Sequence, residues 1–132
     1  FADIAQAAAF DGGIDMVFSD FNHSQDSIQA LLAAFLPRMA ESASIFIDSA
    51  STQRLSYLTL EAVVDSLNQN KIPKAFIKDR SEEDIEVVLR IIQRSRFRLM
   101  HLLEACDRVQ NSTAWISIEP VDVIPTAATF LH

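Results

Sequence analysis

Residues 14–20 read IDMVFSD and residues 43–48 read ASIFID, and these two short segments decide the fold. Each is an apolar run, rich in β-branched and aromatic residues, that ends in aspartate, a pattern typical of a buried strand. Between them, apolar side chains from Ile28 to Leu36 recur at the spacing of one helical face, and Pro37 follows that pattern. The succession of strand, helix and strand predicts a βαβ unit with parallel strands and a right-handed crossover.

The segments that flank this unit favour further helices. Residues 2–10 are rich in alanine and free of glycine and proline, which predicts a short helix. A second helix is expected to run from a cap at Ser51 or Thr52 to residues 68–70. A third is expected over residues 82–94, where a serine followed by three acids provides the start of a capping box.

The last third of the chain predicts an antiparallel hairpin. Residues 97–104 form an apolar run, residues 107–112 are turn-like, and residues 113–119 are β-branched and aromatic. Consecutive strands joined by a short loop are antiparallel. We therefore expect one mixed sheet in which the strand at 113–119 lies beside the strand at 44–48. The tail from Pro120 shows no clear period and predicts no element.

Composition places the chain in a broad class. It has 132 residues, of which 49% are hydrophobic and 22% charged, the balance of one soluble globular domain. No apolar run reaches the roughly 20 residues that cross a bilayer, and the start resembles neither a signal peptide nor an anchor. We expect a cytoplasmic location and no membrane partner. The single cysteine, Cys106, excludes an internal disulfide.

Glycine content and charge exclude two further classes. The two glycines, Gly12 and Gly13, are adjacent, so the chain lacks a glycine-rich turn that could hold a dinucleotide or nucleoside triphosphate. The formal charge of −7 arises in residues 1–70, which contain nine acidic residues and only two basic residues, Arg38 and Arg54. This distribution argues against nucleic acid as a partner. The arginines at residues 90–98 fall at a predicted helix end, which favours cations.

The order of elements, together with IDMVFSDFNHS at residues 14–24 and ASIFID at residues 43–48, resembles the C-terminal half of a class I S-adenosylmethionine-dependent methyltransferase. The resemblance implies an α/β fold: a partial Rossmann-like sheet of parallel strands with helices on both faces and a terminal antiparallel hairpin. It covers residues 1–132 as one domain. The first three strands of the family and its glycine-rich cofactor turn have no counterpart here.

The resemblance also implies a site at the carboxyl ends of the strands, where open α/β sheets bind ligands. Asp20 and His23 are expected to be catalytic, with His23 as the general base. The other interpretation of His23 is a helix-start residue that bonds to the backbone. Asp20 and Asp48 are candidate Mg²⁺ ligands, as in metal-dependent O-methyltransferases. In that subset asparagine follows the later aspartate, whereas Ser49 follows Asp48 here.

For the cofactor, the resemblance implies that Phe1, Asp3, Asp20 and Phe21 contact S-adenosylmethionine. The methyl acceptor is expected to be a small molecule. Because most cofactor contacts of the family come from the half that has no counterpart, we expect this chain alone neither to bind S-adenosylmethionine nor to transfer a methyl group.

The strand at 14–20 would form an edge of this sheet. Its side chains are apolar on both faces, and it lacks the lysine or proline that blunts natural edges. We expect it to pair with a preceding segment of a complete domain or with a second copy of the protein. The first gives part of a methyltransferase, and the second gives a noncatalytic methyltransferase-like interaction or dimerisation module. The sequence upstream of Phe1 would distinguish them.

Overall fold

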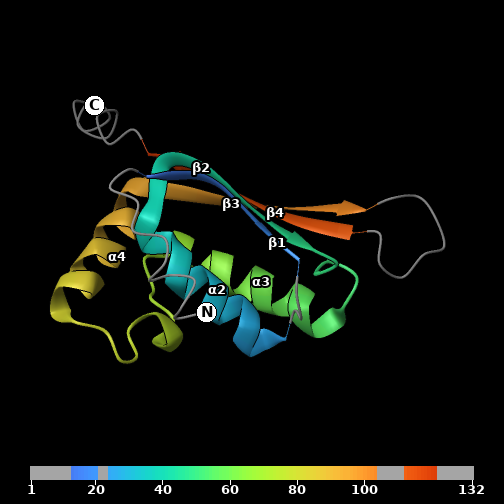
Figure 1. The fold of residues 1–132 in the computed structure, drawn as a ribbon, viewed down its shortest axis with the longest axis horizontal. Coiled ribbons are helices and arrows are strands. Elements are labelled where there is room, and N and C mark those ends of the chain that lie inside the picture. Colours follow the sequence, from blue (N-terminus) through green and yellow to red (C-terminus); the bar gives the residue numbers. More distant parts are fainter. Residues whose placement is uncertain (1–12, 21–23, 104–111, 122–132) are drawn as a thin grey trace, which may run out of the picture.

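In the described part of the chain, four strands form one mixed sheet and three α-helices pack against it (Figure 1). The computed structural model describes residues 13–20, 24–103 and 112–121. Within these ranges the elements are β1 (Ile14–Ser19), α2 (Gln25–Phe35), β2 (Met39–Asp48), α3 (Arg54–Asn68), α4 (Glu82–Arg94), β3 (Ser95–Leu103) and β4 (Ser112–Pro120), with short 3₁₀ turns η1 (Leu36–Arg38) and η2 (Lys74–Phe76).

The sheet has the strand order β1-β2-β4-β3. β1 and β2 are parallel, with Phe18 opposite Phe46. β4 runs antiparallel to both of its neighbours, so that Trp115 lies opposite Phe46 on one side and Met100 on the other. The predicted parallel pair, the hairpin, and the place of the last strand beside the second are therefore confirmed.

β2 is longer than the sequence pattern indicates, because it begins at Met39 rather than at residue 43. Its register against β1 shifts between Ile14 and Met16. Near this shift Gly13 lies so close to the neighbouring strand that an added Cβ would meet the Ala40 Cα at 2.7 Å. Glycine permits this approach, which pairs β1 with a part of β2 that has little apolar pattern.

Serine side chains cap two of the helices. Ser24 accepts a hydrogen bond from the Ser27 amide at the start of α2, and Ser81 accepts one from the Asp84 amide at the start of α4. The predicted bounds of α4 are confirmed. The predicted cap of α3 at Ser51 or Thr52 is wrong, since α3 begins after Gln53.

The reason lies in the partners of the two hydroxyl groups. The Ser51 Oγ lies 2.7 Å from the Nδ1 of His101, and Thr52 donates to the backbone carbonyl of Ser49 at 3.3 Å. These partners orient both side chains toward groups outside α3, and the helix begins after Gln53.

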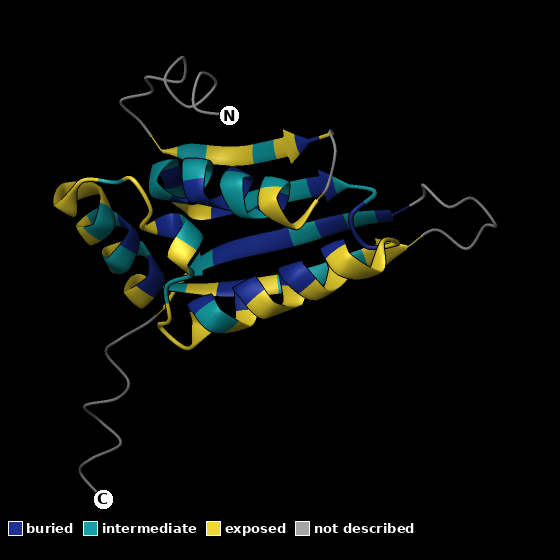
Figure 2. Cartoon of the chain, turned by 90° about the horizontal axis from the view of Figure 1, so that it is seen from below, coloured by how far each residue is buried: buried dark blue, intermediate teal, exposed yellow. Residues whose placement is uncertain are grey.

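The three described helices lie on the same face of the sheet (Figure 1), which corrects the expectation of helices on both faces for the described part of the chain. Strand residues alternate between the two faces. Ile45 and Ile116 point toward the helices and are buried, whereas Phe46 and Trp115 point the other way and are stacked at 5.6 Å between ring centroids. Figure 2 shows the helical layer with its buried and exposed sides.

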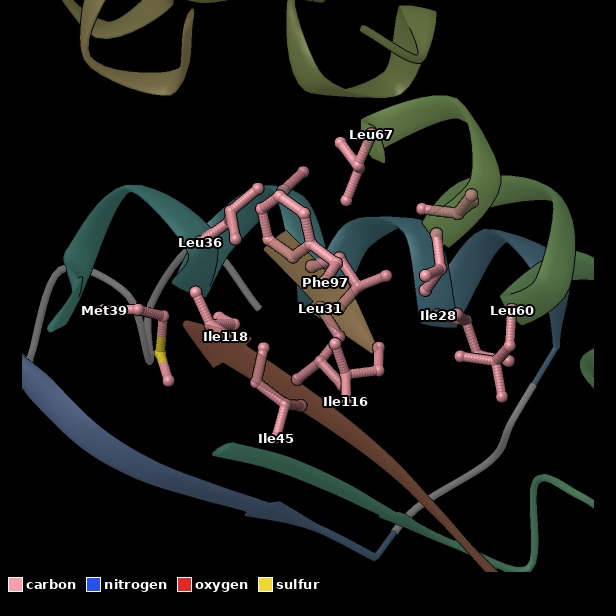
Figure 3. Packing of buried hydrophobic residues seen from close by; sticks show 14 of the residues in the cluster. Ile28, Leu31, Leu36, Met39, Ile45, Leu60, Leu67, Phe97, Ile116 and Ile118 are labelled. Carbon is pink, nitrogen blue, oxygen red and sulfur yellow. The ribbon is translucent and has the colours of Figure 1, made fainter. Parts of the chain in front are cut away.

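The hydrophobic core fills the space between this helical layer and the sheet (Figure 3). Isoleucines of β2 and β4 meet leucines of α2 and α3 there, and Phe76 of η2 is completely buried. The fully buried large side chains are Phe76, Ile28, Leu31, Leu32, Leu36, Ile45, Ile47, Leu60, Leu67, Ile92, Ile116 and Ile118. The βαβ unit, α3 and the hairpin thus share one core, which fixes the position of the strand ends.

Some expectations fall on residues that are not described. The helix at 2–10, Cys106 and most of the turn at 107–112 lie outside the described ranges. In the described part, no helix has the length and apolar character needed to span a membrane.

Candidate functional site

The candidate site lies at the end of the sheet where the C-termini of three strands meet. β1 and β2 are parallel, and β3 runs in the same direction because it is antiparallel to β4, which is antiparallel to β2. The C-terminal ends of β1, β2 and β3 therefore share one edge with the start of β4. The sequence analysis predicted the candidate residues at this end of the sheet.

Asp20 and Asp48 are the two predicted site residues that the structure describes. Asp20 follows β1 and is exposed, whereas Asp48 ends β2 and is half-buried. Ser19 lies opposite Ile47 in the parallel ladder, so the two aspartates follow neighbouring positions of adjacent strands. One Asp48 oxygen, Oδ2, accepts a hydrogen bond from the Ser49 hydroxyl at 3.1 Å. The two aspartates therefore lie at the same end of the sheet, and the expectation that their side chains share one cleft with His23 stays a prediction.

The remaining predicted site residues, Phe1, Asp3, Phe21 and His23, lie outside the described ranges. Their expected roles stay predictions. Among the described residues, no group of three or more histidine, cysteine, aspartate or glutamate side chains is arranged to hold a metal ion. Two carboxylates are nevertheless the number that Mg²⁺ commonly takes from a protein while it keeps several waters.

Sequence reasoning missed a polar cluster that lies at the same edge. The His101 ring, on β3, has its Nε2 2.8 Å from the Glu61 Oε1 and its Nδ1 2.7 Å from the Ser51 Oγ. Tyr57 stacks on the imidazole with 4.1 Å between ring centroids. We call Ser51, Tyr57, Glu61 and His101 the histidine cluster.

The partners of the ring nitrogens assign the proton positions in the neutral imidazole. A carboxylate only accepts hydrogen bonds, so Nε2 carries the proton and donates a hydrogen bond to Glu61. Nδ1 then accepts from the Ser51 hydroxyl. The order of serine, histidine and carboxylate is that of a catalytic triad. Ser51, however, retains only 9% of its surface, whereas a nucleophile must reach its substrate.

The histidine cluster therefore has a positioning role. It ties the segment after β2 to α3 and to β3, elements that are distant in sequence. His101 lies within the apolar run at 97–104, between Leu99-Met100 and Leu102-Leu103. A polar side chain between apolar neighbours was the sequence signal that could have identified it.

The segment after β2 has two further attachments. Ser49 adopts a positive φ of 58°, which turns the chain sharply out of the strand, and its amide donates to the Ser112 carbonyl at 2.7 Å. The Ser112 hydroxyl in turn donates to Thr52 at 3.3 Å. These contacts hold the rim beside Asp48 against the start of β4.

In comparisons with known proteins, no family model, curated protein or solved structure matches this chain.

Proposed function

We propose that this chain forms the C-terminal half of a class I S-adenosylmethionine-dependent methyltransferase domain that acts on a small-molecule acceptor. The strand order β1-β2-β4-β3 carries the proposal. An antiparallel last strand inserted between two strands of common direction is the ending that the resemblance implies. A hairpin that simply extended the sheet would place β3, not β4, beside β2.

The uncovered face of the sheet supports the proposal that this chain is half of a larger domain. Parallel strands are normally covered on both faces, and β1 and β2 form a parallel pair. Here Met16 and Phe18 of β1 are 64% and 63% exposed, and Leu102 of β3 is 47% exposed. Phe46 and Trp115 lie between them on the same face. A further helical layer against this face would remove the apolar surface from water.

The outer strand of the sheet, β1, also supports the proposal that this chain is part of a larger domain. β1 pairs with β2 alone among the described strands. Its outer backbone groups are open to another strand, and its side chains include no lysine or proline. In a complete domain a preceding parallel strand would fill this position.

In such a domain, Asp20 and Asp48 would lie at the floor of the ligand site. S-adenosylmethionine supplies an electrophilic methyl group, and the residues of this chain would orient the acceptor and remove its proton. His23 is the proposed base, Phe1, Asp3, Asp20 and Phe21 the proposed cofactor contacts, and Asp20 with Asp48 the proposed ligands if Mg²⁺ is used.

A second candidate is a noncatalytic methyltransferase-like interaction or dimerisation module. The exposed apolar β1 edge favours it, because the same surface can bind a second copy of the chain or another protein. The two candidates differ in what fills the edge and the open face.

The test compares this chain with the protein encoded by its whole gene. Upstream of Phe1, the methyltransferase requires a strand followed by a glycine-rich turn. In calorimetry we expect the longer protein to bind S-adenosylmethionine with micromolar affinity. Emission of Trp115, the single tryptophan, should lie at shorter wavelength in the longer protein because the open face is covered. A different upstream domain without cofactor binding would reject the enzyme in favour of the module.

A further inference from the structure

A cavity of about 310 Å³ lies at the opposite end of the sheet from Asp20 and Asp48. The start of β2, the start of β3 and the end of β4 contribute to its wall, and α4 closes one side. In Figure 1 this is the end of the sheet beside α4. The cavity is therefore separate from the candidate methyl-transfer site.

The wall of the cavity is mainly apolar. Met39 and Pro120 come from the strands, and Val87 and Ile91 are one turn apart on α4. These two α4 residues are only half-buried, whereas Val88 and Ile92 of the same helix are buried in the core. α4 thus has a second apolar stripe that faces the cavity. The volume of the cavity lies at the small end of the range for ligand pockets.

Two arginines add positive charge to this wall. Arg90 and Arg94 lie one turn apart on α4. The ion pairs of the described residues join Arg98 to Glu119 and His101 to Glu61, which leaves both cavity arginines without a carboxylate partner there. Like charges at this spacing repel each other, and an anion placed between them would relieve the repulsion.

A further arginine, Arg38, belongs to the element that precedes the cavity wall. Arg38 of η1 directly precedes Met39, and η1 packs against α4. Its Nη1 is buried and has no hydrogen-bond partner among the described residues. Glu41 is the carboxylate that lines the cavity, and it is exposed. Of the charged side chains that line the cavity, two are arginines and one is a carboxylate, and this balance favours an anionic ligand.

We propose that this cavity binds a small amphipathic carboxylate, with its carboxylate on Arg90 and Arg94 and its short apolar body against Met39, Val87 and Ile91. The planar guanidinium groups match the two oxygens of a carboxylate. The site does not depend on the proposed methyl transfer, because it shares no residue with that site.

Titration of the chain with hexanoate, followed by ¹H–¹⁵N chemical shifts, tests the proposal. We expect saturable shifts that centre on the α4 amides from Val87 to Arg94, with a Kd on the order of 1 mM for so small a ligand. Hexanamide, which lacks the charge, and acetate, which lacks the chain, should each bind at least about tenfold more weakly. Equal binding of either analogue would overturn the proposal.

Substitutions of single arginines test which side chains bind the carboxylate of hexanoate. Arg90→Gln and Arg94→Gln should each raise the Kd for hexanoate about three- to tenfold. Arg54→Gln removes the same charge from the start of α3 and should leave the Kd unchanged. All three side chains are exposed, so the variants should keep the wild-type spectrum elsewhere. Equal weakening by Arg54→Gln, shifts centred elsewhere, or no saturation would each reject the site.

Discussion

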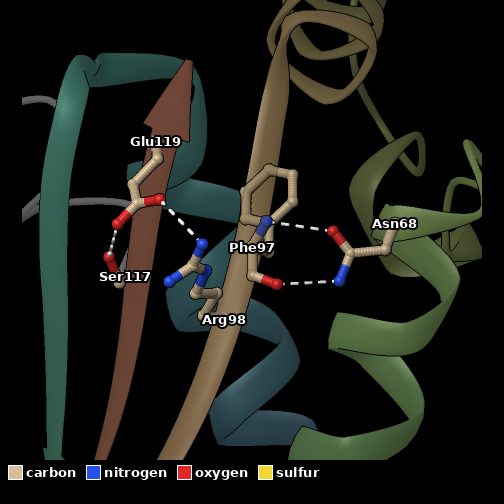
Figure 4. Close-up of polar contacts among 5 residues, drawn as sticks. All are labelled: Asn68, Phe97, Arg98, Ser117 and Glu119. Atoms are coloured by element: carbon tan, nitrogen blue, oxygen red, sulfur yellow. Dashed lines mark hydrogen bonds and ion pairs between the residues drawn. The ribbon is translucent and has the colours of Figure 1, made fainter. Parts of the chain in front are cut away.

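The Asn68 side chain bonds both backbone polar groups of Phe97. Its Nδ2 donates to the Phe97 carbonyl at 2.8 Å, and its Oδ1 accepts from the Phe97 amide at 2.9 Å (Figure 4). β3 is an edge strand of the described sheet. The carboxamide at the end of α3 therefore takes the place of a neighbouring strand and satisfies groups that would otherwise be buried without a partner.

Asn68→Ala should lower the free energy of unfolding by about 1–3 kcal/mol, because it leaves the amide and carbonyl of the buried Phe97 without partners. Urea denaturation followed by far-UV circular dichroism measures this loss. Gln69→Ala is the matched control, since Gln69 is exposed and bonds only to Asp65 and Lys71 through its side chain. Its effect should stay within about 0.5 kcal/mol. Equal losses for both variants would contradict the edge-capping role.

The histidine cluster should be a stabilising tie rather than a nucleophilic centre. His101→Ala removes the partner of the buried Ser51 hydroxyl and the ring on which Tyr57 stacks, and should cost about 2–3 kcal/mol. Glu61→Gln should cost less than about 1 kcal/mol, because the Glu61 side chain is 49% exposed. Thermal and urea unfolding measure both changes.

A double-mutant cycle measures the interaction energy between His101 and Glu61 separately from their other contacts. His101→Ala and Glu61→Gln should show a coupling energy of about 0.5–1 kcal/mol, whereas His101→Ala and the distant, exposed Glu82→Gln should be additive. Labelling of Ser51 by an organophosphonate that reacts with activated serines would refute the positioning role and indicate an exposed nucleophile.

The β1 edge should drive association of the isolated chain. We expect sedimentation equilibrium to show concentration-dependent self-association, because β1 presents open backbone groups beside Met16 and Phe18. Phe18→Lys should weaken it at least about tenfold by placing a charge in the contact. Leu55→Lys is the control, since Leu55 is equally exposed at 64% but lies on α3. A wild-type chain that stays monomeric, or equal weakening by both variants, would count against the edge.

Cofactor binding should require more than this chain. By calorimetry the 132 residues alone should show no micromolar binding of S-adenosylmethionine, because the strands and the glycine turn that hold most of the cofactor in the family are absent from it. A monomer that binds at micromolar concentration would show that our assignment of the site is wrong.

In the protein encoded by the whole gene, Asp20→Asn should lower cofactor affinity or methyl transfer at least about tenfold. Asp15→Asn is its control, because Asp15 is also exposed and lies on β1, but away from the strand end. If both substitutions leave the affinity unchanged, Asp20 is not part of the site.

Local pattern was sufficient for several elements. A serine and three acids before a regular apolar period predicted α4 with its observed bounds, because a cap and a helical face are encoded by neighbouring residues. The aspartate-ended runs predicted β1 and the end of β2 for the same reason. The start of β2 was missed, since Met39 joins the sheet through backbone pairing with β1 rather than through its own pattern.

The sequence by itself determined the order and type of the elements and, through the βαβ unit, the common edge of Asp20 and Asp48. Only the tertiary structure decided which face of the sheet the helices cover, and it brought Ser51, Glu61 and His101 within hydrogen-bond distance of one another. It likewise placed Arg90 and Arg94 beside Met39. The physical reason is that periodicity reports only whether a side chain is buried, whereas its partners depend on long-range packing between segments that are distant in the chain.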